Sequence, residues 1–237
     1  MKILSIIVPV YNEEKTILKI LKKINKVNLN KLNLKKEIIV VDDGSNDNTP
    51  SLLKKNKELY DKLLTKRNEG KGSAIKRGLK EAKGDIILIQ DADLEYNPNQ
   101  IPKLVRPIIN NETMVVYGSR FLRKKYHIFG KTRTIIPLHL IGNILLSIIT
   151  KILYFSNITD METCYKIFRM EVIMNMKLRS KKFDFEPEIT AKILKRGYEI
   201  VELPIKFNAR DFDAGKKITW KDGLYAVMYL LIYRFVD

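Results

Sequence analysis

Short apolar runs alternate with helical patterns through the first half of the chain. The runs are rich in Ile and Val and are continuous, rather than alternating with polar residues. Continuous runs of this kind are typical of strands that are buried on both faces of a parallel sheet. The predicted strands are Ile3–Val8, Glu37–Val41, Asp85–Ile89 and Thr113–Tyr117.

Between these strands the apolar residues recur at helical spacing, which predicts helices. Asn12 is expected to cap the first helix, Glu13–Val27, and Thr49-Pro50 reads as a cap followed by proline at the first helical position. Two further helices are predicted over Gly72–Lys83, with Gly84 as the stop, and over Pro98–Ile109. This order predicts an α/β fold with a mostly parallel mixed sheet and flanking helices, in which ligands bind at the carboxyl ends of the strands.

Two long apolar helices are predicted in the second half. In residues 135–155 the polar positions His139, Asn143, Ser147 and Thr150 form one narrow stripe, so this helix either lies in the core or lies in a membrane interface. Pro137 and the polar residues argue against a single membrane span. The last helix, 220–236, carries Tyr225, Tyr229 and Tyr233 on one face, as a helix packed on the sheet or at a membrane surface would. A helix over Glu186–Lys195, stopped by Gly197, and a strand over Glu199–Phe207 complete the prediction.

Composition narrows the functional classes. The chain of 237 residues is 45% hydrophobic, which excludes a disordered protein, and its single cysteine excludes a disulfide framework. The two histidines argue against a His-rich zinc site. A formal net charge of +17 favours anionic partners, namely nucleic acid, an anionic membrane face or phosphate substrates. The single cysteine favours a reducing compartment, and the amino terminus lacks the pattern of a secretory signal.

Three polar clusters directly follow predicted strands. They are Asn12-Glu13-Glu14, Asp42-Asp43-Gly44-Ser45 and Asp91-Ala92-Asp93. Parallel strands bring their carboxyl ends to one edge, so these clusters are expected to share a site. The hard oxygens of Asp91 and Asp93, with Glu95 two residues on, suit Mg²⁺ or Mn²⁺ bridging a substrate diphosphate.

A glycine-rich loop, Asn68–Ala74, enters a predicted helix. Its backbone amides are expected to face a phosphate or a nucleoside, and Lys71 adds positive charge. The loop lacks both the Walker pattern and the GxGxxG pattern, so neither a P-loop nor a dinucleotide fold is indicated.

The motifs together carry a family resemblance. Ile7–Glu13, Val41–Ser45, the Asn68-x-Gly-Lys-Gly loop and Asp91-Ala92-Asp93 resemble, in order and spacing, the catalytic domain of glycosyltransferase family 2, which has the GT-A fold. Within that family the chain most resembles the polyprenyl-phosphate glycosyltransferases, among them the dolichyl-phosphate mannose synthases. The narrower likeness rests on Gly118-Ser119-Arg120, on the stretch 160–169 and on Phe185-Glu186-Pro187-Glu188.

The resemblance implies a role for each matching position. Residues 1–120 would form the nucleotide-sugar-binding part, and residues 121–237 the acceptor-binding part, of one continuous catalytic domain. The nucleotide sugar would be bound by Pro9, Tyr11, Glu13, Asp42, Asp43, Gly70, Lys71, Asp91, Ala92 and Lys216. The divalent cation, Mg²⁺ or Mn²⁺, would be bound by Asp91, Asp93 and Glu95. The catalytic group would comprise Asp93, Arg120, Arg133 and Arg210, with the arginines holding phosphates.

The leading functional hypothesis is an inverting transfer of a hexose, from GDP-mannose or UDP-glucose, to a polyprenyl (dolichyl) phosphate. The protein would act peripherally at the cytoplasmic face of a membrane without a clear span, and a separate membrane-anchoring subunit is a candidate partner. Glu162-Thr163-Cys164 stands where mannose synthases commonly have Ser-Gly, which leaves the sugar open. The alternative is a family 2 enzyme acting on a glycan hydroxyl. Such an acceptor needs a carboxylate base, for which Asp160, Glu162, Glu186 and Glu188 are candidates.

A nucleic-acid-binding protein is the third interpretation of the positive charge. The sequence contains no aromatic RNA-binding motif, zinc-finger spacing or basic zipper. The acidic clusters at the sheet edge would also repel a phosphate backbone. No nucleic-acid partner is therefore expected.

Overall fold

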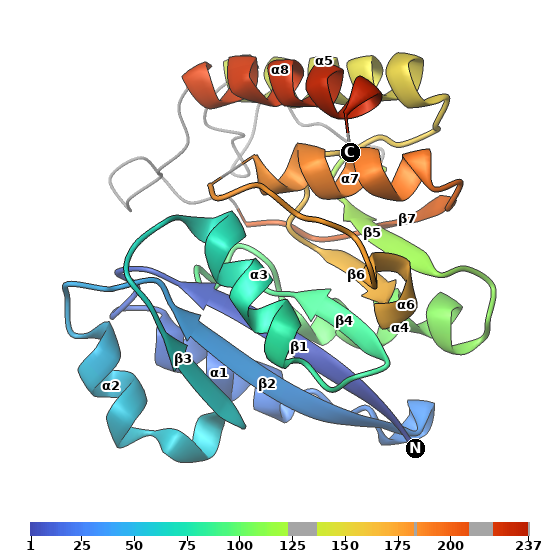
Figure 1. The fold of residues 1–237 in the computed structure, drawn as a ribbon. Helices are drawn as coiled ribbons and strands as arrows, with labels where there is room; N and C mark the ends of the chain where they lie inside the picture. Colours follow the sequence, from blue (N-terminus) through green and yellow to red (C-terminus); the bar gives the residue numbers. More distant parts are fainter. Residues whose placement is uncertain (123–136, 183, 209–219, 237) are drawn as a thin grey trace.

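The computed structural model describes residues 1–122, 137–182, 184–208 and 220–236. Within these ranges the chain forms one mixed sheet with helices on both faces (Figure 1). The strands are β1 (Lys2–Val10), β2 (Leu34–Asp42), β3 (Lys62–Thr65), β4 (Ile86–Ile89), β5 (Val115–Ser119), β6 (Lys166–Arg169) and β7 (Ile200–Pro204). The α-helices are α1 (Ile17–Lys26), α2 (Thr49–Lys55), α3 (Lys71–Glu81), α4 (Ile101–Ile109), α5 (Pro137–Tyr154), α6 (Met170–Ile173), α7 (Phe185–Lys195) and α8 (Trp220–Phe235). Three short 3-10 turns, η1 (Asn30–Leu32), η2 (Lys57–Leu59) and η3 (Pro98–Gln100), lie between them.

The strand order is β3-β2-β1-β4-β6-β5-β7. The pairs among β3, β2, β1 and β4 are parallel, whereas β6 runs antiparallel to both of its neighbours. This arrangement confirms the predicted mixed α/β sheet. Because β6 is reversed, its first residues lie at the edge where the parallel strands end. The polar clusters after β1, β2 and β4 therefore meet the loop that precedes β6.

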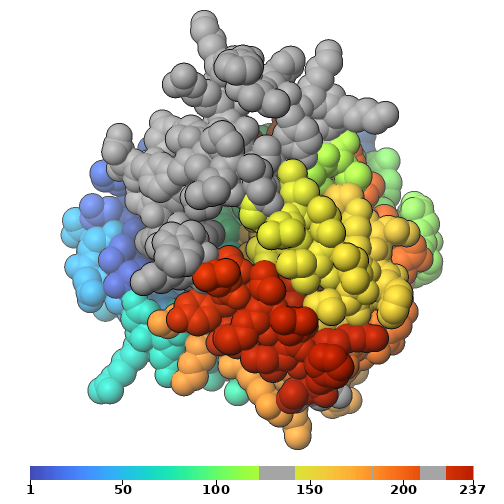
Figure 2. All heavy atoms as spheres, turned by 90° about the horizontal axis from the view of Figure 1, so that it is seen from above, coloured from blue at the N-terminus to red at the C-terminus, as the bar shows by residue number. Residues whose placement is uncertain are grey.

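The helices are layered on the sheet. The helix α3 packs closely on β1 and β2, since a Cβ built on Gly78 would lie 2.6 Å from Ile7 Cγ2. Helix α7 lies between the sheet and an outer layer that α5 and α8 form together (Figure 1). Seen from above, α5 in yellow and α8 in red lie side by side on the surface (Figure 2).

Two strands, β3 and β6, were not predicted from the sequence. The strand β3 has four residues, lies at the edge of the sheet and is only half-buried, so its apolar signal is weak. The strand β6 has the sequence KIFR, and its buried Lys166 interrupts the apolar pattern that identifies the other strands. The predicted N-cap at Asn12 is wrong: α1 begins at Ile17, and Asn12 instead adopts a left-handed backbone with φ of 53°.

The polar stripe of α5 faces the protein. Ser147 and Thr150 are buried, and their hydroxyls donate to backbone oxygens one turn earlier. The exposed side of α5 and α8 is apolar, and we call it the outer apolar face. It comprises Ile144, Leu145, Ile148, Ile152, Phe155, Leu224, Tyr225, Met228, Leu231, Ile232 and Phe235. The interpretation of α5 as a core helix is therefore wrong.

Helix α8 packs on α5 and α7, and not on the sheet as one interpretation had it. Its predicted tyrosine face is divided: Tyr225 is exposed, Tyr229 is half-buried and Tyr233 is buried. No helix in the described part of the chain combines the length and the apolar character that crossing a membrane requires.

Candidate active site

The loops after β1 and β2 are fastened to each other at the edge of the sheet. The Asn12 amide donates to Ser45 Oγ at 2.9 Å, and the Asn46 amide donates back to Asn12 Oδ1 at 2.8 Å. The Glu13 amide donates to Thr49 Oγ1 at 2.9 Å, at the start of α2. These reciprocal bonds explain the left-handed backbone of Asn12, a conformation that asparagine tolerates better than most residues.

Both carboxylates of the Asp42-Asp43 pair are buried and hold the surrounding loops. Asp42 Oδ1 accepts from the amide and the hydroxyl of Ser45, at 3.0 and 2.6 Å. Asp43 Oδ1 lies 2.7 Å from Lys66 Nζ, and its Oδ2 accepts from the Gly70 amide at 2.7 Å. The pair therefore shapes the edge beside the predicted nucleoside site.

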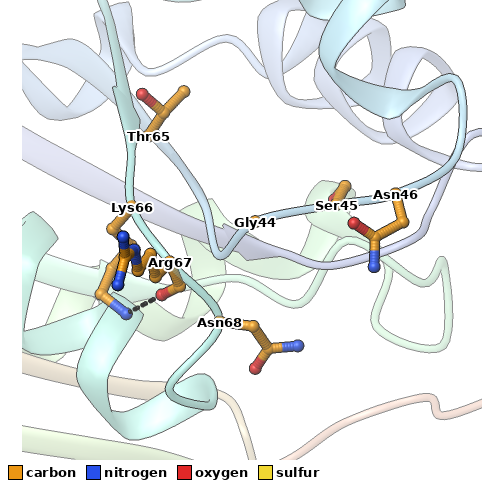
Figure 3. Close-up of a pocket in the computed structure, with 7 residues that line it drawn as sticks. All are labelled: Gly44, Ser45, Asn46, Thr65, Lys66, Arg67 and Asn68. Carbon is orange, nitrogen blue, oxygen red and sulfur yellow. Dashed lines mark hydrogen bonds between the residues drawn. The ribbon is translucent and has the colours of Figure 1, made fainter.

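An open pocket of about 510 Å³ lies beyond the ends of β2 and β3. Figure 3 shows its lining, which is Gly44, Ser45, Asn46, Thr65, Lys66, Arg67 and Asn68. The ammonium of Lys66 is directed to the carbonyl of Arg67 at 2.7 Å as well as to Asp43. Of the other predicted nucleotide-binding residues nearby, Pro9 is buried within β1, and Tyr11 and Glu13 are half-buried just after it.

Four amides of the glycine-rich loop already donate to acceptors within the protein. The Glu69 and Gly70 amides donate to Asp43, at 3.2 and 2.7 Å. The Gly72 and Ser73 amides donate to the carbonyls of Lys182 and Lys181, at 3.1 and 2.9 Å. The prediction that these amides face a phosphate is therefore wrong for this conformation. Glycine is required here because a Cβ on Gly70, whose φ is 102°, would lie 2.6 Å from the Lys181 carbonyl oxygen.

Lys71 bridges two acids from different parts of the chain. Its Nζ lies 2.9 Å from Asp91 Oδ1 and 2.9 Å from Glu186 Oε1. Burial alone would lower the pKa of Lys71, but the charge of Asp91 and of Glu186 outweighs it and raises the pKa well above its usual value. The thiol of Cys164 is buried beside Asp91. Burial, together with the charge of Asp91, raises the pKa of this thiol. Lys71 thus contacts Asp91, one member of the acidic pair Asp91 and Asp93 that follows β4, where the cation site is predicted.

The acidic pair after β4 is partly open. Ala92 between its two members is buried, and Asp91 and Asp93 are both partly exposed. Asp93 Oδ1 accepts from the Glu95 amide at 3.1 Å, which fixes the turn. Within the described ranges no three His, Cys, Asp or Glu side chains converge as a metal-binding group, so Asp91, Asp93 and Glu95 do not form a ready-made set. Mg²⁺ is nevertheless commonly bound by only one or two protein carboxylates, with substrate phosphate oxygens and waters as its other ligands.

Arg120 lies at the same edge, directly after β5. Its Nε and Nη2 donate to Asp160 Oδ2 and Oδ1, both at 2.7 Å, and its amide donates to Oδ2 at 2.9 Å. The guanidinium also stacks within 5.3 Å of the rings of Phe121 and Phe207. Nε and Nη2 are thus engaged, and Nη1 has no acceptor among the described residues.

The four candidate bases differ in their partners. Asp160 is paired with Arg120, Glu186 with Lys71, and Glu188 with Lys192 at 2.7 Å. Glu162 has a buried Oε1 that finds no hydrogen-bond partner within the described ranges. Three predicted site residues, Arg133, Arg210 and Lys216, lie outside the described residues.

Two charged residues at this edge, buried Lys166 and half-buried Glu202, were missed by the sequence interpretation. Lys166 begins β6 and is buried, with its Nζ donating to the Met161 carbonyl at 2.7 Å and lying over the Tyr117 ring. Glu202 in β7 accepts from the amides of Thr159 and Asp160, at 2.7 and 2.9 Å, and so orients the loop that carries Asp160. A charged residue inside an otherwise apolar stretch was the available signal for Lys166.

Comparisons with known proteins agree with the geometry. The family model described as glycosyl transferase family 2 matches residues 5–176. A UDP-N-acetylglucosamine–dolichyl-phosphate N-acetylglucosaminyltransferase of Methanococcus voltae is 30% identical, over 86% of this chain and 85% of that protein. A dolichol-phosphate mannosyltransferase of Pyrococcus furiosus is 33% identical over 87% of this chain, which spans 56% of that longer protein.

Solved structures share the fold. Glucosyl-3-phosphoglycerate synthase of Mycobacterium tuberculosis, crystallised with UDP, matches with a TM-score of 0.71 at 18% identity, over 100% of this chain and 81% of that chain. The same enzyme with Mn²⁺, UDP and glucosyl-3-phosphoglycerate matches with a TM-score of 0.67. At this level of identity the likeness concerns the fold alone.

Proposed function

Because the chain belongs to glycosyl transferase family 2, we propose that it transfers a hexose from a nucleotide sugar, GDP-mannose or UDP-glucose, to a polyprenyl (dolichyl) phosphate. The names of the relatives from Methanococcus voltae and Pyrococcus furiosus support this class of acceptor. Their different sugars leave the donor open, so an N-acetylhexosamine donor also fits.

The orientation of α5 is the observation that carries the proposal. The helix turns its apolar side outward, while buried Ser147 accepts a hydrogen bond from the Met161 amide at 3.3 Å. Met161 directly follows Asp160, the partner of Arg120. An outward apolar surface is thereby joined to the loop that holds a cationic clamp, as an enzyme acting on a lipid with a phosphate head group requires.

The outer apolar face supports peripheral binding to a membrane. Helices that lie in the interface bury an apolar side in the lipid and keep cations at its border. Phe155 and Phe235, at the ends of α5 and α8, are 88% and 83% exposed, and the guanidinium of Arg234 lies 5.8 Å from the Phe155 ring. We place this face on the anionic, cytoplasmic side of a membrane, where the net charge of +17 also assists binding.

The chemistry proposed is a direct inverting displacement. An oxygen of the acceptor phosphate bonds to the anomeric carbon while the bond from that carbon to the diphosphate oxygen breaks, and the nucleoside diphosphate leaves with the electron pair. A phosphate monoester is already ionised near pH 7, because its second pKa is about 6, so no general base is needed. Arg120, presented by Asp160, would hold the acceptor phosphate, since a guanidinium suits bidentate phosphate contact.

Asp91 and Asp93 would hold the divalent cation, Mg²⁺ or Mn²⁺, together with oxygens of the donor diphosphate. Their hard, partly exposed carboxylates fit such an ion. When bound, the ion offsets the negative charge that develops on the leaving diphosphate. Lys71, now 2.9 Å from Asp91, would then remain paired with Glu186.

A glycan hydroxyl is the alternative acceptor. A hydroxyl must lose its proton during transfer, and this requires a carboxylate base. Asp160, Glu186 and Glu188 are each paired with a cation, so Glu162 is the described acid that best suits that role.

A transfer assay tests the proposal. The purified protein, Mn²⁺ or Mg²⁺ and polyprenyl phosphate in detergent would be offered radiolabelled GDP-mannose, UDP-glucose and UDP-N-acetylglucosamine in turn. Label that moves into the organic phase from one donor, and stops moving with EDTA, supports the proposal and identifies the sugar. Metal-dependent donor hydrolysis without lipid product would support the glycan alternative. The matched control is Glu112→Gln, an exposed acid beyond α4.

A further inference from the structure

Glu162 lies between the two proposed phosphate sites. It is two residues after Asp160, which holds Arg120, and two residues before Cys164, whose thiol lies against Asp91. Its Oε1 is buried and has no hydrogen-bond partner among the described residues. No Lys or Arg among the described residues forms an ion pair with it.

The surroundings of Glu162 disfavour a negative charge. Glu186 on α7 and Asp160 on the same loop are anionic neighbours, whereas Lys166 on β6 and Arg120 after β5 are cationic ones. Both cations are engaged elsewhere, Arg120 with Asp160 and Lys166 with the Met161 carbonyl and the Tyr117 ring. Burial and then the charge of Glu186 raise the pKa of Glu162 to about 8, while burial lowers the pKa of Lys166 to about 8.

Glu186 carries a second unpartnered oxygen close to this position. Its Oε1 is paired with Lys71, but its Oε2 is buried and has no hydrogen-bond partner in the described part of the chain. Two buried carboxyl groups that each present a bare oxygen are far more stable with one proton than with none. Glu186 is the acid paired with a cation, so the proton belongs on Glu162.

We propose that Glu162 is a neutral carboxylic acid at neutral pH and donates a hydrogen bond to an anionic oxygen of the bound substrates. This inference rests on the proposed transfer to a polyprenyl phosphate. A carboxylate in this place would repel both the donor diphosphate and the acceptor phosphate, whereas a protonated acid attracts them. The residue would thus position two anions, and it would not act as a base.

The two roles predict opposite responses to pH. If Glu162 works as a neutral donor, kcat/KM for lipid transfer falls as pH rises above about 8, the pKa of Glu162. If Glu162 works as a base, kcat/KM rises over the same range. The variant Glu162→Gln retains a hydrogen-bond donor of the same shape, so it should keep at least about a tenth of the activity, whereas loss of a general base costs about 10²–10⁴-fold.

The experiment combines a pH profile with a direct titration. We would measure kcat/KM between pH 6 and about 9.5 for the wild type, Glu162→Gln, Glu162→Asp and the exposed control Glu58→Gln. In parallel, the carboxyl ¹³C signal of Glu162 in Glu-labelled protein would be assigned by its absence from Glu162→Gln, or by its absence from Glu162→Asp if the first variant does not fold.

A titration midpoint near 8, with a fall in activity at high pH that disappears in Glu162→Gln, is the expected result. A midpoint below about 6 would overturn the proposal, since that is close to an ordinary carboxyl. A fall that persists in Glu162→Gln would overturn it as well, because it would assign the pH dependence to Lys166. Absence of lipid transfer at every pH would refute the proposed function, while the ¹³C titration would still decide the protonation state of Glu162.

Discussion

The sheet edge at which the parallel strands end has two regions, one beyond β1 and β2 and one beyond β4 and β5. The acidic side chains of the two regions differ in how completely they are hydrogen-bonded. Beyond β1 and β2, Asp42 and Asp43 are satisfied by neighbouring amides, a hydroxyl and Lys66. Beyond β4 and β5, Asp160 is satisfied by Arg120, but Glu162 and Glu186 each keep a buried oxygen without a partner in the described chain. The acids beyond β1 and β2 have all their hydrogen bonds from the protein. The acids beyond β4 and β5 leave oxygens to which a proton or a ligand can bind.

The comparison also concerns the surfaces next to each region. The pocket beyond β2 and β3 is open to water and is lined by glycine and by polar or charged residues. The loop before β6 is attached through Ser147 to a helix whose outward side is apolar. A water-soluble donor and a lipid acceptor would therefore approach the same edge from two different environments.

The largest effect is expected for the acidic pair after β4. Asp93→Asn should lower kcat for lipid transfer by about 10³-fold, because it removes charge stabilisation at the leaving diphosphate. Stability should change little, since Asp93 is partly exposed. Transfer kinetics and thermal unfolding would be measured together, with Glu112→Gln as the control. Full activity in Asp93→Asn would remove this residue from the cation site.

The next largest effect concerns the free energy of unfolding, which should fall by different amounts when an acid in either region of the sheet edge is replaced. Asp160→Asn should lower the free energy of unfolding by about 3–5 kcal/mol, because it removes the fully buried charged partner of the half-buried Arg120 guanidinium. Asp43→Asn should cost less, about 1–2 kcal/mol, because Lys66 also pairs with Glu69 and keeps a counter-charge. Urea denaturation of both variants measures the difference. Equal losses would contradict the distinction between the two regions.

Membrane binding should depend on the outer apolar face. Phe155→Ser together with Phe235→Ser should weaken binding to vesicles of anionic lipid by at least about 100-fold, because burial of each phenylalanine contributes about 1.5–3 kcal/mol. The control is Met174→Ser, an exposed apolar residue outside α5 and α8. Sedimentation with vesicles gives the partition coefficients. Absence of binding by the wild type would instead point to an anchoring subunit that covers this face.

The smallest effect concerns the paired acid of α7. Burial alone would raise the pKa of Glu188, but hydrogen bonds from Lys192 and from the Ser180 and Arg179 amides outweigh it and lower the pKa below 4.5. The stabilisation from Glu188 is therefore present above about pH 4.5 and is lost as pH falls through its folded pKa. Glu188→Gln should make stability less dependent on pH in that acid range. Thermal unfolding between pH 3 and about 6 checks the slope, and an unchanged slope would contradict the assignment.

Much of the fold could be predicted because it rests on local patterns. The strands β1, β2, β4 and β5 are continuous apolar runs, and their positions were found to within a few residues. The weakly apolar β3 and the interrupted β6 were missed, because the packing that makes them strands comes from distant segments. Asn12 looked like a helix cap, but its reciprocal bonds with the loop after β2 place it elsewhere.

The sequence by itself determined the order of the strongly apolar strands and the longer helices, the polar clusters that end three strands, and the family. Each of these depends on neighbouring residues, whose spacing is visible in the chain. The tertiary structure alone decided that Arg120 meets Asp160, that Lys71 joins Asp91 to Glu186, and that α5 turns its polar stripe inward. These outcomes join residues far apart in sequence, and the free energy of a buried charge depends on partners that only packing provides.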